Sequence, residues 1–186
     1  MAVKRFHRHR AVFLDKDGTL VENVPYNVDP DRIRLTPGAG AGLSMLHGAG
    51  FRLVVITNQS GVGRGLFSLE RLEEIHDRLR QMAESIGVRL EGIYYCPHVP
   101  DAGCLCRKPQ TGLFDQAASE LGFDASSAVV IGDKMSDIEF GHRAGAATVL
   151  VAPNSPSLAQ GPKPDFVARD LIQAAEVIVP GYLLKE

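Results

Sequence analysis

Carboxylates stand directly after short apolar runs in two places along this chain. Asp15 and Asp17 lie in DKDGT after the run AVFL, and Asp133 lies in GDKMSD after the run AVVI. Carboxylates at close quarters stay ionised together only when protons or a cation compensate their charge. Oxygen ligands suit a hard cation, and Mg²⁺ is the natural candidate. We therefore expect Asp15, Asp17 and Asp133 to form a Mg²⁺ site, with Asp137 close enough to orient it.

Cationic and hydroxyl side chains accompany these acids. Lys108 follows Arg107, and Thr57 ends the apolar run LVVI. A metal ion flanked by cations suits a phosphate better than a neutral substrate. Asp15 would attack phosphorus and form an aspartyl-phosphate. Asp17 would protonate the leaving oxygen and then take a proton from the hydrolytic water. Thr57 and Lys108 would hold the phosphoryl oxygens.

All three cysteines lie within CPHVPDAGCLCRKP, residues 96–109. The spacing C-x-H-x5-C-x-C makes Cys96, His98, Cys104 and Cys106 candidate ligands of one ion. Four ligands of these types fill a tetrahedron around zinc, which indicates a structural rather than a catalytic site. Side chains two positions apart share one face of an extended segment, so each short pair can reach the same ion. Free thiols and a redox pair at Cys104 and Cys106 are the alternatives.

Alternating strands and helices must bring these residues together. Apolar runs predict strands at 11–14, 51–57, 93–95, 128–131, 147–151 and 166–168. Apolar spacing predicts helices at 38–47, 69–86, 112–121 and 137–144, and a short helix at the C-terminus. This alternation predicts a mostly parallel sheet covered by helices on both faces. Ligands of such sheets bind beyond the carboxyl ends of the strands, where the polar groups above would meet.

We expect one domain spanning residues 1–186, with its core in residues 11–152. The fold class is α/β, a Rossmann-like three-layer sandwich without room for a large cap domain, carrying a zinc-binding loop at 96–106. Three histidines in predicted helices, His47, His76 and His142, are interpreted as surface or hydrogen-bonded core residues.

Composition excludes several classes of protein. The 186 residues carry a formal net charge of -2 with a pI near 6.3, which argues against binding nucleic acid through bulk positive charge. No apolar run approaches the roughly 18 residues needed to span a bilayer. The basic segment 1–10 lacks the apolar stretch of a signal peptide and is interpreted as a solvated tail. An odd number of cysteines excludes a complete disulfide framework, so we expect a cytoplasmic protein.

The motifs resemble those of the haloacid dehalogenase-like phosphohydrolase superfamily. The matching segments are DxDG[TV] at 15–19, [ST]N at 57–58, lysine before proline at 108 and GD-x-x-x-D at 132–137. The resemblance runs from about residue 11 to about residue 152. It implies a Rossmann-like fold, the nucleophile Asp15 and the general acid/base Asp17. It also implies Mg²⁺ at Asp15, Asp17 and Asp133, with Asp17 binding through its backbone carbonyl.

Within the superfamily, TNQSGVGRGLF at 57–67, the cysteine segment and GDK at 132–134 resemble the family of D-glycero-D-manno-heptose-1,7-bisphosphate 7-phosphatases. That resemblance implies zinc at the four residues named above and removal of a sugar 7-phosphate in the synthesis of activated heptose for lipopolysaccharide. It implies substrate contacts at Asn23, Val24, Pro25, Tyr26, Asn58, Gln59, Ser60, Arg107 and Lys134.

Histidinol-phosphate phosphatases share the zinc loop and supply the alternative function. Another small sugar-phosphate phosphatase and a non-catalytic binding module are further alternatives. The expected partner is a small phosphorylated sugar, without nucleic acid or membrane, and we expect a monomer because a capless enzyme can act alone on a small substrate.

Overall fold

A six-stranded parallel sheet forms the centre of the protein. The structure is a computed structural model that describes residues 10–123, 125–153 and 161–183. The strand order is β3-β2-β1-β4-β5-β6, and every neighbouring pair runs parallel. The strands are β1 (Ala11–Leu14), β2 (Arg52–Asn58), β3 (Leu90–Cys96), β4 (Ala128–Gly132), β5 (Ala147–Val151) and β6 (Phe166–Ala168).

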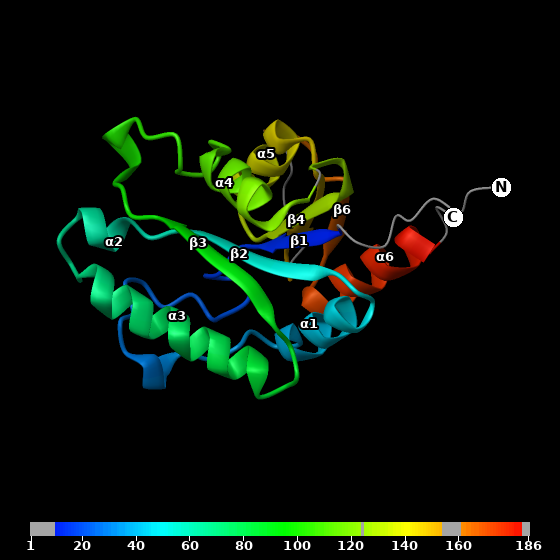
Figure 1. Cartoon of the computed structure of the whole chain (residues 1–186), viewed down its shortest axis with the longest axis horizontal. Helices are drawn as coiled ribbons and strands as arrows, with labels where there is room; N and C mark the ends of the chain where they lie inside the picture. The colour runs from blue at the N-terminus through cyan, green and yellow to red at the C-terminus, as the bar shows by residue number, and fades with distance from the viewer. Residues whose placement is uncertain (1–9, 124, 154–160, 184–186) are drawn as a thin grey trace.

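Helices cover both faces of this sheet, as Figure 1 shows. They are α1 (Ala39–Gly48), α2 (Ser60–Gly63), α3 (Leu69–Glu84), α4 (Gly112–Leu121), α5 (Met135–Ala144) and α6 (Leu171–Leu183). Helices α1, α3 and α6 lie on one face, and α4 and α5 lie on the other (Figure 1). The result is the three-layer α/β sandwich that the sequence predicts.

Alternate side chains of β1 pack into two separate apolar cores. Val12 and Leu14 pack into the core beneath α1, α3 and α6, whereas Ala11 and Phe13 face α4 and α5. Successive residues of a strand point to opposite faces, so a central strand must be apolar at every position. All four residues of β1 are accordingly buried. The strand is thereby fixed on both sides, and with it the position of the residue that follows, Asp15.

Most predicted elements are confirmed, with differences at their ends. The helix predicted to reach residue 86 ends at Glu84, and Gly87 takes a positive φ of 74° just beyond it. The strand predicted at 93–95 runs from Leu90 to Cys96, because pairing with β2 extends it through strand-breaking Gly92. The helix α2 has no counterpart in the prediction, since its SGVG sequence is a poor helix former.

Two expectations about surface and termini have separate outcomes. His76 is fully buried, and neither ring nitrogen has a hydrogen-bond partner among the described residues, so the interpretation as a surface or hydrogen-bonded residue is wrong there. His142 does bond, with its Nε2 3.2 Å from Thr148 Oγ1. The predicted basic tail, apart from Arg10, and most of the proline-rich segment 153–164 lie outside the described residues.

The described residues contain no separate cap over the carboxyl ends of the strands. Between β1 and α1, the regular structure is limited to the three-residue 3-10 helix Pro30–Arg32 and isolated bridges at Val21. No helix in the described ranges has both the length and the apolar character required to cross a membrane.

Candidate active site

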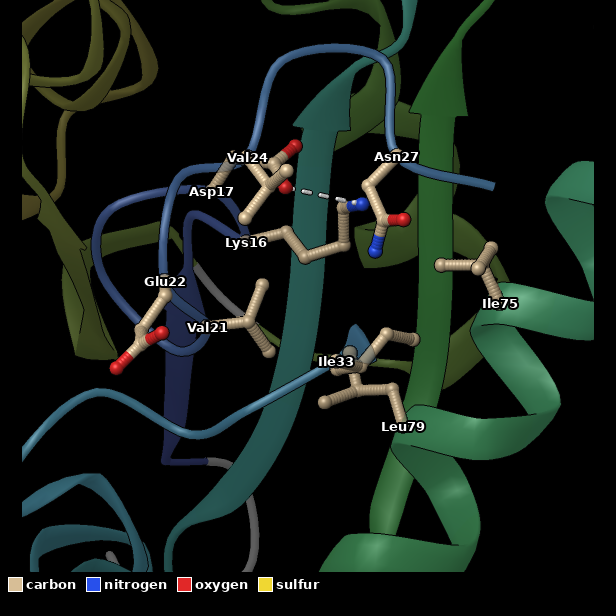
Figure 2. Close-up of a pocket in the computed structure, with 9 residues that line it drawn as sticks. All are labelled: Lys16, Asp17, Val21, Glu22, Val24, Asn27, Ile33, Ile75 and Leu79. Atoms are coloured by element: carbon tan, nitrogen blue, oxygen red, sulfur yellow. Dashed lines mark ion pairs between the residues drawn. The ribbon is translucent and has the colours of Figure 1, made fainter. Parts of the chain in front are cut away.

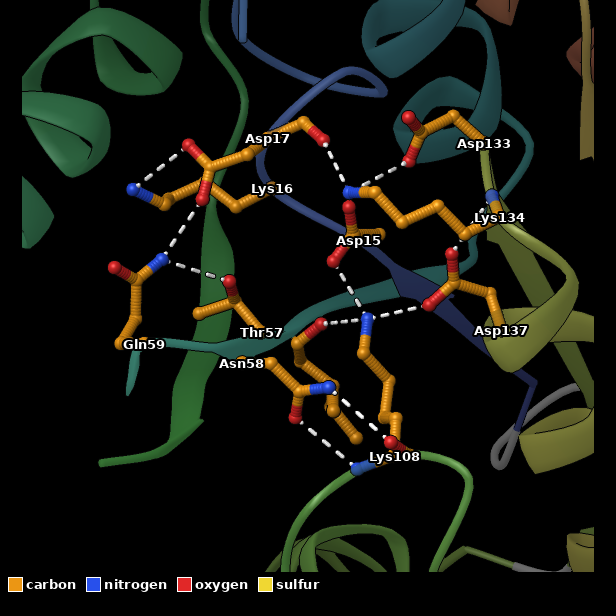
Figure 3. Close-up of polar contacts among 11 residues, drawn as sticks. Asp15, Lys16, Asp17, Thr57, Asn58, Gln59, Lys108, Asp133, Lys134 and Asp137 are labelled. Carbon is orange, nitrogen blue, oxygen red and sulfur yellow. Dashed lines mark hydrogen bonds and ion pairs between the residues drawn. The ribbon is translucent and has the colours of Figure 1, made fainter. Parts of the chain in front are cut away.

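The site lies where the sheet reverses its order, between the carboxyl ends of β1 and β4. The chain leaves β1 toward β2 on one side and reaches β4 on the other, which opens a crevice between the two strands. Asp15 extends the ladder beyond β1, since its N–H donates to the Ile131 carbonyl at 2.9 Å. Figure 3 shows the acids from both strand ends gathered there, with Lys108 reaching them from the loop before α4.

Lys108 is a buried cation held between two acids. Its Nζ lies 2.6 Å from Asp15 Oδ1, 2.6 Å from Asp137 Oδ1 and 2.9 Å from the Ile56 carbonyl (Figure 3). Burial by itself lowers the pKa of Lys108, but the negative charges of Asp15 and Asp137 outweigh it and raise that pKa above its usual value. The ammonium therefore remains charged and fixes one oxygen of Asp15.

Asp15, Asp133 and Asp137 form a cluster of acids that can hold a metal ion. Each offers an oxygen, and these oxygens lie within 4.8 Å of one another. Asp15 Oδ2 and Asp133 Oδ1 are buried without a hydrogen bond to the described residues. Burial and the charge of Asp15 raise the pKa of Asp133 to about 6. Clustered, unsatisfied carboxylate oxygens of this kind fit a hard divalent cation.

Asp137 and Asp17 differ in how they contact Asp15, Asp133 and their neighbours. Asp137 uses one oxygen on Lys108, and its Oδ2 accepts the backbone N–H of Lys134 at 3.1 Å. Asp17 turns its backbone carbonyl toward the cluster, where it accepts a hydrogen bond of 3.3 Å from Lys134 Nζ. That ammonium also lies 3.5 Å from Asp133 Oδ1. The Asp17 carbonyl and the Asp133 carboxylate thus both lie near the Lys134 ammonium group.

The side chain of Asp17 points away from the Asp15 carboxylate (Figure 3). Its Oδ2 accepts a hydrogen bond of 2.8 Å from Gln59 Nε2, and its Oδ1 lies 3.1 Å from Lys16 Nζ. Gln59 Nε2 also donates to Thr57 Oγ1 at 2.9 Å. One amide group therefore links the two predicted catalytic side chains that approach the site from β1 and β2.

Asn58 holds the backbone of Lys108 rather than pointing freely into solvent. Its Oδ1 accepts the Lys108 N–H at 3.1 Å, and its Nδ2 donates to the Lys108 carbonyl at 3.2 Å. Both polar ends of the amide are engaged, so the loop carrying Lys108 is fixed to the end of β2.

An open cavity of about 310 Å³ lies beside these groups. It collects eight of the nine residues for which the sequence predicts substrate contacts: Asn23, Val24, Pro25, Tyr26, Asn58, Gln59, Ser60 and Lys134. Arg107 is not among its lining residues, and its Nη1 donates to the His98 carbonyl at 3.3 Å. Lys16, Asp17, Asn27 and Gly61 complete the lining.

The segment 22–29 forms one wall of this cavity and is tied to α3. Arg71 Nη2 donates to the Val28 carbonyl at 3.0 Å. The Asp29 N–H donates to Asn27 Oδ1 at 3.1 Å, which closes a local turn. Tyr26, half exposed at the cavity, adopts a positive φ of 52°, which is uncommon for a residue with a side chain. The segment is therefore held by a few polar contacts.

A second, much smaller cavity of about 10 Å³ lies below the segment, where Figure 2 shows Lys16 extending toward Asp17. Its lining combines Lys16, Asp17, Glu22 and Asn27 with apolar side chains: Val21, Val24, Ile33, Ile75 and Leu79. No motif in the sequence gives a role to Lys16 or Asn27. The position of Lys16 between the two aspartates was the available signal for it, whereas Asn27 has no motif that marks it.

Cys96, His98, Cys104 and Cys106 come together as one group able to hold a metal ion. The sulfur–sulfur distances are 3.1, 3.5 and 3.6 Å, and His98 Nδ1 lies 3.2 Å from Cys106 Sγ. A tetrahedral zinc with bonds of about 2.3 Å to sulfur separates its ligands by about 3.8 Å. The four ligand atoms are therefore close to the spacing of a tetrahedral site. Cys106 stands two residues before Lys108, so the cluster adjoins the phosphate-handling end predicted from the sequence.

The chain is similar in sequence to several known proteins. Residues 105–174 match the family model described as HAD-hydrolase-like. A D-glycero-beta-D-manno-heptose-1,7-bisphosphate 7-phosphatase from Haemophilus ducreyi is 38% identical over 172 residues, covering 88% of this chain and 94% of the relative. The histidine biosynthesis bifunctional protein HisB of Legionella pneumophila is 38% identical over 138 residues, covering 73% of this chain but 39% of its own length.

A solved structure is also similar along most of its length. The D,D-heptose 1,7-bisphosphate phosphatase of B. bronchiseptica, complexed with magnesium and phosphate, superposes with a TM-score of 0.83 at 33% identity. The match covers 92% of this chain and 99% of that one.

Proposed function

Because the chain belongs to the haloacid dehalogenase-like hydrolases, in the family of the heptose-bisphosphate 7-phosphatases, we propose that it removes the 7-phosphate of D-glycero-D-manno-heptose 1,7-bisphosphate. Such a reaction belongs to the synthesis of activated heptose for the lipopolysaccharide core. One observation carries the proposal above all. The Asp15 carboxylate has one oxygen on Lys108 and the other without a hydrogen-bond partner in the described part of the chain, beside a cavity large enough for a sugar.

Asp15 is the nucleophile in this proposal. The Lys108 ammonium, 2.6 Å from Oδ1, orients the carboxylate. Oδ2, which has no hydrogen-bond partner among the described residues, attacks phosphorus. The bond between phosphorus and the sugar oxygen breaks, and its electron pair leaves with that oxygen. Thr57 and Lys108 donate to the phosphoryl oxygens as negative charge develops on them.

Asp17 moves the protons. Its carboxyl group donates a proton to the leaving sugar oxygen, and the resulting carboxylate then accepts a proton from water. The oxygen of that water attacks the phosphorus of the aspartyl-phosphate, which releases inorganic phosphate and restores Asp15. Asp17 needs a fixed orientation for both transfers, and Gln59 holds its Oδ2.

Two metal ions complete the proposed site. Asp15, Asp133 and the Asp17 carbonyl would hold Mg²⁺, with Asp137 orienting them through Lys108 and Lys134. When bound, Mg²⁺ neutralises charge on the transferring phosphoryl group. Cys96, His98, Cys104 and Cys106 would hold a structural Zn²⁺ that stabilises the loop preceding Lys108.

The lining of the cavity favours a sugar bisphosphate. Its polar side chains are amides, one serine hydroxyl, one phenol, two lysines and, among the described residues, one acid, Asp17, which is already paired with Lys16. Amides and hydroxyls suit the hydroxyl groups of a sugar, and Lys134 offers positive charge to a phosphate. We also propose contacts from Asn23, Val24, Pro25, Tyr26, Asn58, Gln59 and Ser60, and from Arg107 if substrate binding redirects its guanidinium.

Histidinol phosphate is the second candidate substrate, on the strength of the similarity to HisB. That compound carries an ammonium group and an imidazole, which would call for an unpaired acid in the cavity. The described lining offers none, so we place this function second. A protein that binds phosphorylated sugars without hydrolysing them is the third possibility, although every residue proposed for catalysis is present.

Phosphate release from purified protein tests these alternatives. We expect kcat/KM to be highest with the heptose 1,7-bisphosphate, at least about tenfold above histidinol phosphate, and to depend on Mg²⁺. An Asp15→Asn variant should lose activity by several orders of magnitude while keeping its fold, because the nucleophile is gone. A preference for histidinol phosphate would assign the second function, and absence of turnover with every phosphate ester would leave the binding protein.

We further propose that the protein is cytoplasmic. We also propose that it is a monomer, since the site is complete within one chain. Light scattering of the purified protein at several concentrations tests the oligomeric state, and a mass that doubles with concentration would contradict the monomer.

A further inference from the structure

Lys16 is a buried lysine to which neither the motifs nor the proposed mechanism gives a role. The residue is only 5% exposed, and its Nζ lies 3.1 Å from Asp17 Oδ1. Burying an ammonium group costs free energy, and replacing a whole buried ion pair by apolar side chains is often neutral or stabilising. A purely structural role would therefore not require an ion pair between Lys16 and Asp17.

The surroundings of Lys16 direct its ammonium at Asp17. Figure 2 shows the side chain extended above the apolar residues Ile33, Ile75 and Leu79, with its end at the Asp17 carboxylate. The free volume beside it is about 10 Å³, roughly the space of one water molecule. Lys16 has little room to turn on this side, while its other side borders the larger open cavity, so the ion pair with Asp17 is the contact that fixes its ammonium group.

Asp17 is held from three directions. Lys16 binds one carboxylate oxygen, Gln59 binds the other at 2.8 Å, and Lys134 contacts the backbone carbonyl at 3.3 Å. An aspartate side chain turns about two bonds, and contacts on both oxygens fix both rotations. The Lys16 side chain lies beside the cavity, but its contact in the structure is with Asp17.

We propose that Lys16 is a positioning residue that, together with Gln59, holds the Asp17 carboxyl group in the orientation needed for proton transfer to and from the reacting oxygen. The proposal rests on the phosphatase function above. Lys16 acts through Asp17 in this assignment, and its contribution appears only where the reaction needs the proton.

The need for that proton depends on the leaving group. A sugar alkoxide is a poor leaving group and requires protonation, whereas a 4-nitrophenolate leaves without it. General acid catalysis typically contributes about 10²- to 10⁴-fold. A misplaced Asp17 therefore lowers kcat/KM for the sugar ester and has little effect on kcat/KM for the aryl ester, since this parameter reports the first phosphoryl transfer.

The test compares kcat/KM for heptose 1,7-bisphosphate and 4-nitrophenyl phosphate in the wild-type protein, Lys16→Met and Lys16→Arg. We expect Lys16→Met to lose at least about thirtyfold on the sugar ester and less than about threefold on the aryl ester. Lys16→Arg, which restores a cation, should recover part of the sugar-ester loss. Arg89→Met, which removes a cation that is 77% exposed at the other end of the sheet, is the matched control and should change neither rate.

A double variant sharpens the comparison. If Lys16 acts through Asp17, Lys16→Met should cost little when added to Asp17→Asn, because residues acting as a unit are not additive. Equal losses on both esters, or equal losses with and without Asp17→Asn, would overturn the proposal. Should Lys16→Met unfold, Lys16→Gln retains a polar group and supports the same comparison.

The outcomes also separate this proposal from the proposed function. Wild-type protein that hydrolyses neither ester refutes the phosphatase and the role of Lys16 together. Wild-type protein that hydrolyses both esters, with a folded Lys16→Met that keeps the wild-type ratio between them, refutes the role of Lys16 alone.

Discussion

Asn58 forms two hydrogen bonds with the backbone of Lys108, one from each end of its amide, at 3.1 and 3.2 Å. In the sheet, the same residue stands opposite Cys96, the first of the four Cys/His residues. The end of β2, the Cys/His cluster and the lysine beside Asp15 are thus joined through one residue, by its place in the sheet and by its side chain. The resemblance to known phosphatases implies a substrate contact for Asn58. The geometry adds a structural role, since Asn58 holds the backbone of Lys108.

Replacing Asn58 by leucine should lower kcat about 10- to 100-fold with little change in KM, because the displaced Lys108 no longer orients Asp15. Steady-state kinetics with the heptose bisphosphate measure both parameters. Asn58→Asp is the comparison, since it keeps the acceptor for the Lys108 N–H and should retain more activity. A raised KM at unchanged kcat would instead show that Asn58 serves mainly to bind substrate.

Cys104→Ser should lower the zinc content from about one ion per chain to near zero and reduce kcat about tenfold or more, because the loop before Lys108 loses its support. Elemental analysis by mass spectrometry and kinetics on the same preparation check this together. Leu105→Ser is the matched control, since Leu105 is 78% exposed on the same loop. A zinc-free wild-type protein with full activity would contradict the proposal that a structural Zn²⁺ supports this loop.

Gly18→Ala should weaken Mg²⁺ binding by about tenfold or more. A Cβ at Gly18 would overlap the Asp133 carboxylate, and the residue has a φ of 98° that disfavours any side chain. Gly50→Ala is the control, because Gly50 has a similar φ of 84° but open space around it. Calorimetric Mg²⁺ titration of both variants separates the effect of the contact with Asp133 from the effect of backbone strain. Equal Mg²⁺ affinities of the two variants would contradict the prediction.

His76 should make the fold sensitive to acid. Burial, reinforced by the charges of Lys16 and Arg80, lowers the pKa of His76 to about 3, and the ring also faces Tyr95 and lies 3.7 Å from Glu73. The unfolded chain takes up a proton near pH 6.5, whereas the folded chain resists it down to about pH 3. Stability is therefore fully present above pH 6.5 and falls with decreasing pH, by at most about 1.4 kcal/mol per pH unit.

Urea unfolding between pH 7 and pH 4 tests this prediction with His76→Leu. The free energy of unfolding of the variant should depend less steeply on pH than that of the wild-type protein. His47→Leu, at an exposed position of α1, should keep the wild-type slope. Parallel pH profiles for His76→Leu and the wild-type protein would contradict the effect.

The arrangement of the acids could be predicted because it follows from topology. Asp15 and Asp133 each succeed a buried apolar run, and parallel strands bring such positions to one edge. Cys96, His98, Cys104 and Cys106 could be predicted from ligand type and spacing alone. Both inferences depend on local patterns that the fold preserves.

The partners of individual side chains could not be predicted in the same way. Lys16 and Gln59 meet at Asp17 only because the ends of β1 and β2 lie side by side, and several rotamers of each would satisfy the sequence equally. The burial of His76 depends on which side of α3 faces β3. Arg107 adjoins Lys108 in sequence, yet its guanidinium reaches the His98 carbonyl instead of the cavity.

The attachment of segment 22–29 has a consequence for how this protein can change. Most of the groups proposed for catalysis lie at the ends of strands, whereas this wall of the cavity is tied by the Arg71 contact, one backbone hydrogen bond from Glu22 to Arg34 and local turns. Part of the proposed substrate contacts, from Asn23 to Tyr26, therefore lies in a segment that can vary separately from the strand ends. A new preference among phosphate esters could arise by exchanging a stretch of eight residues, with the reaction itself inherited unchanged.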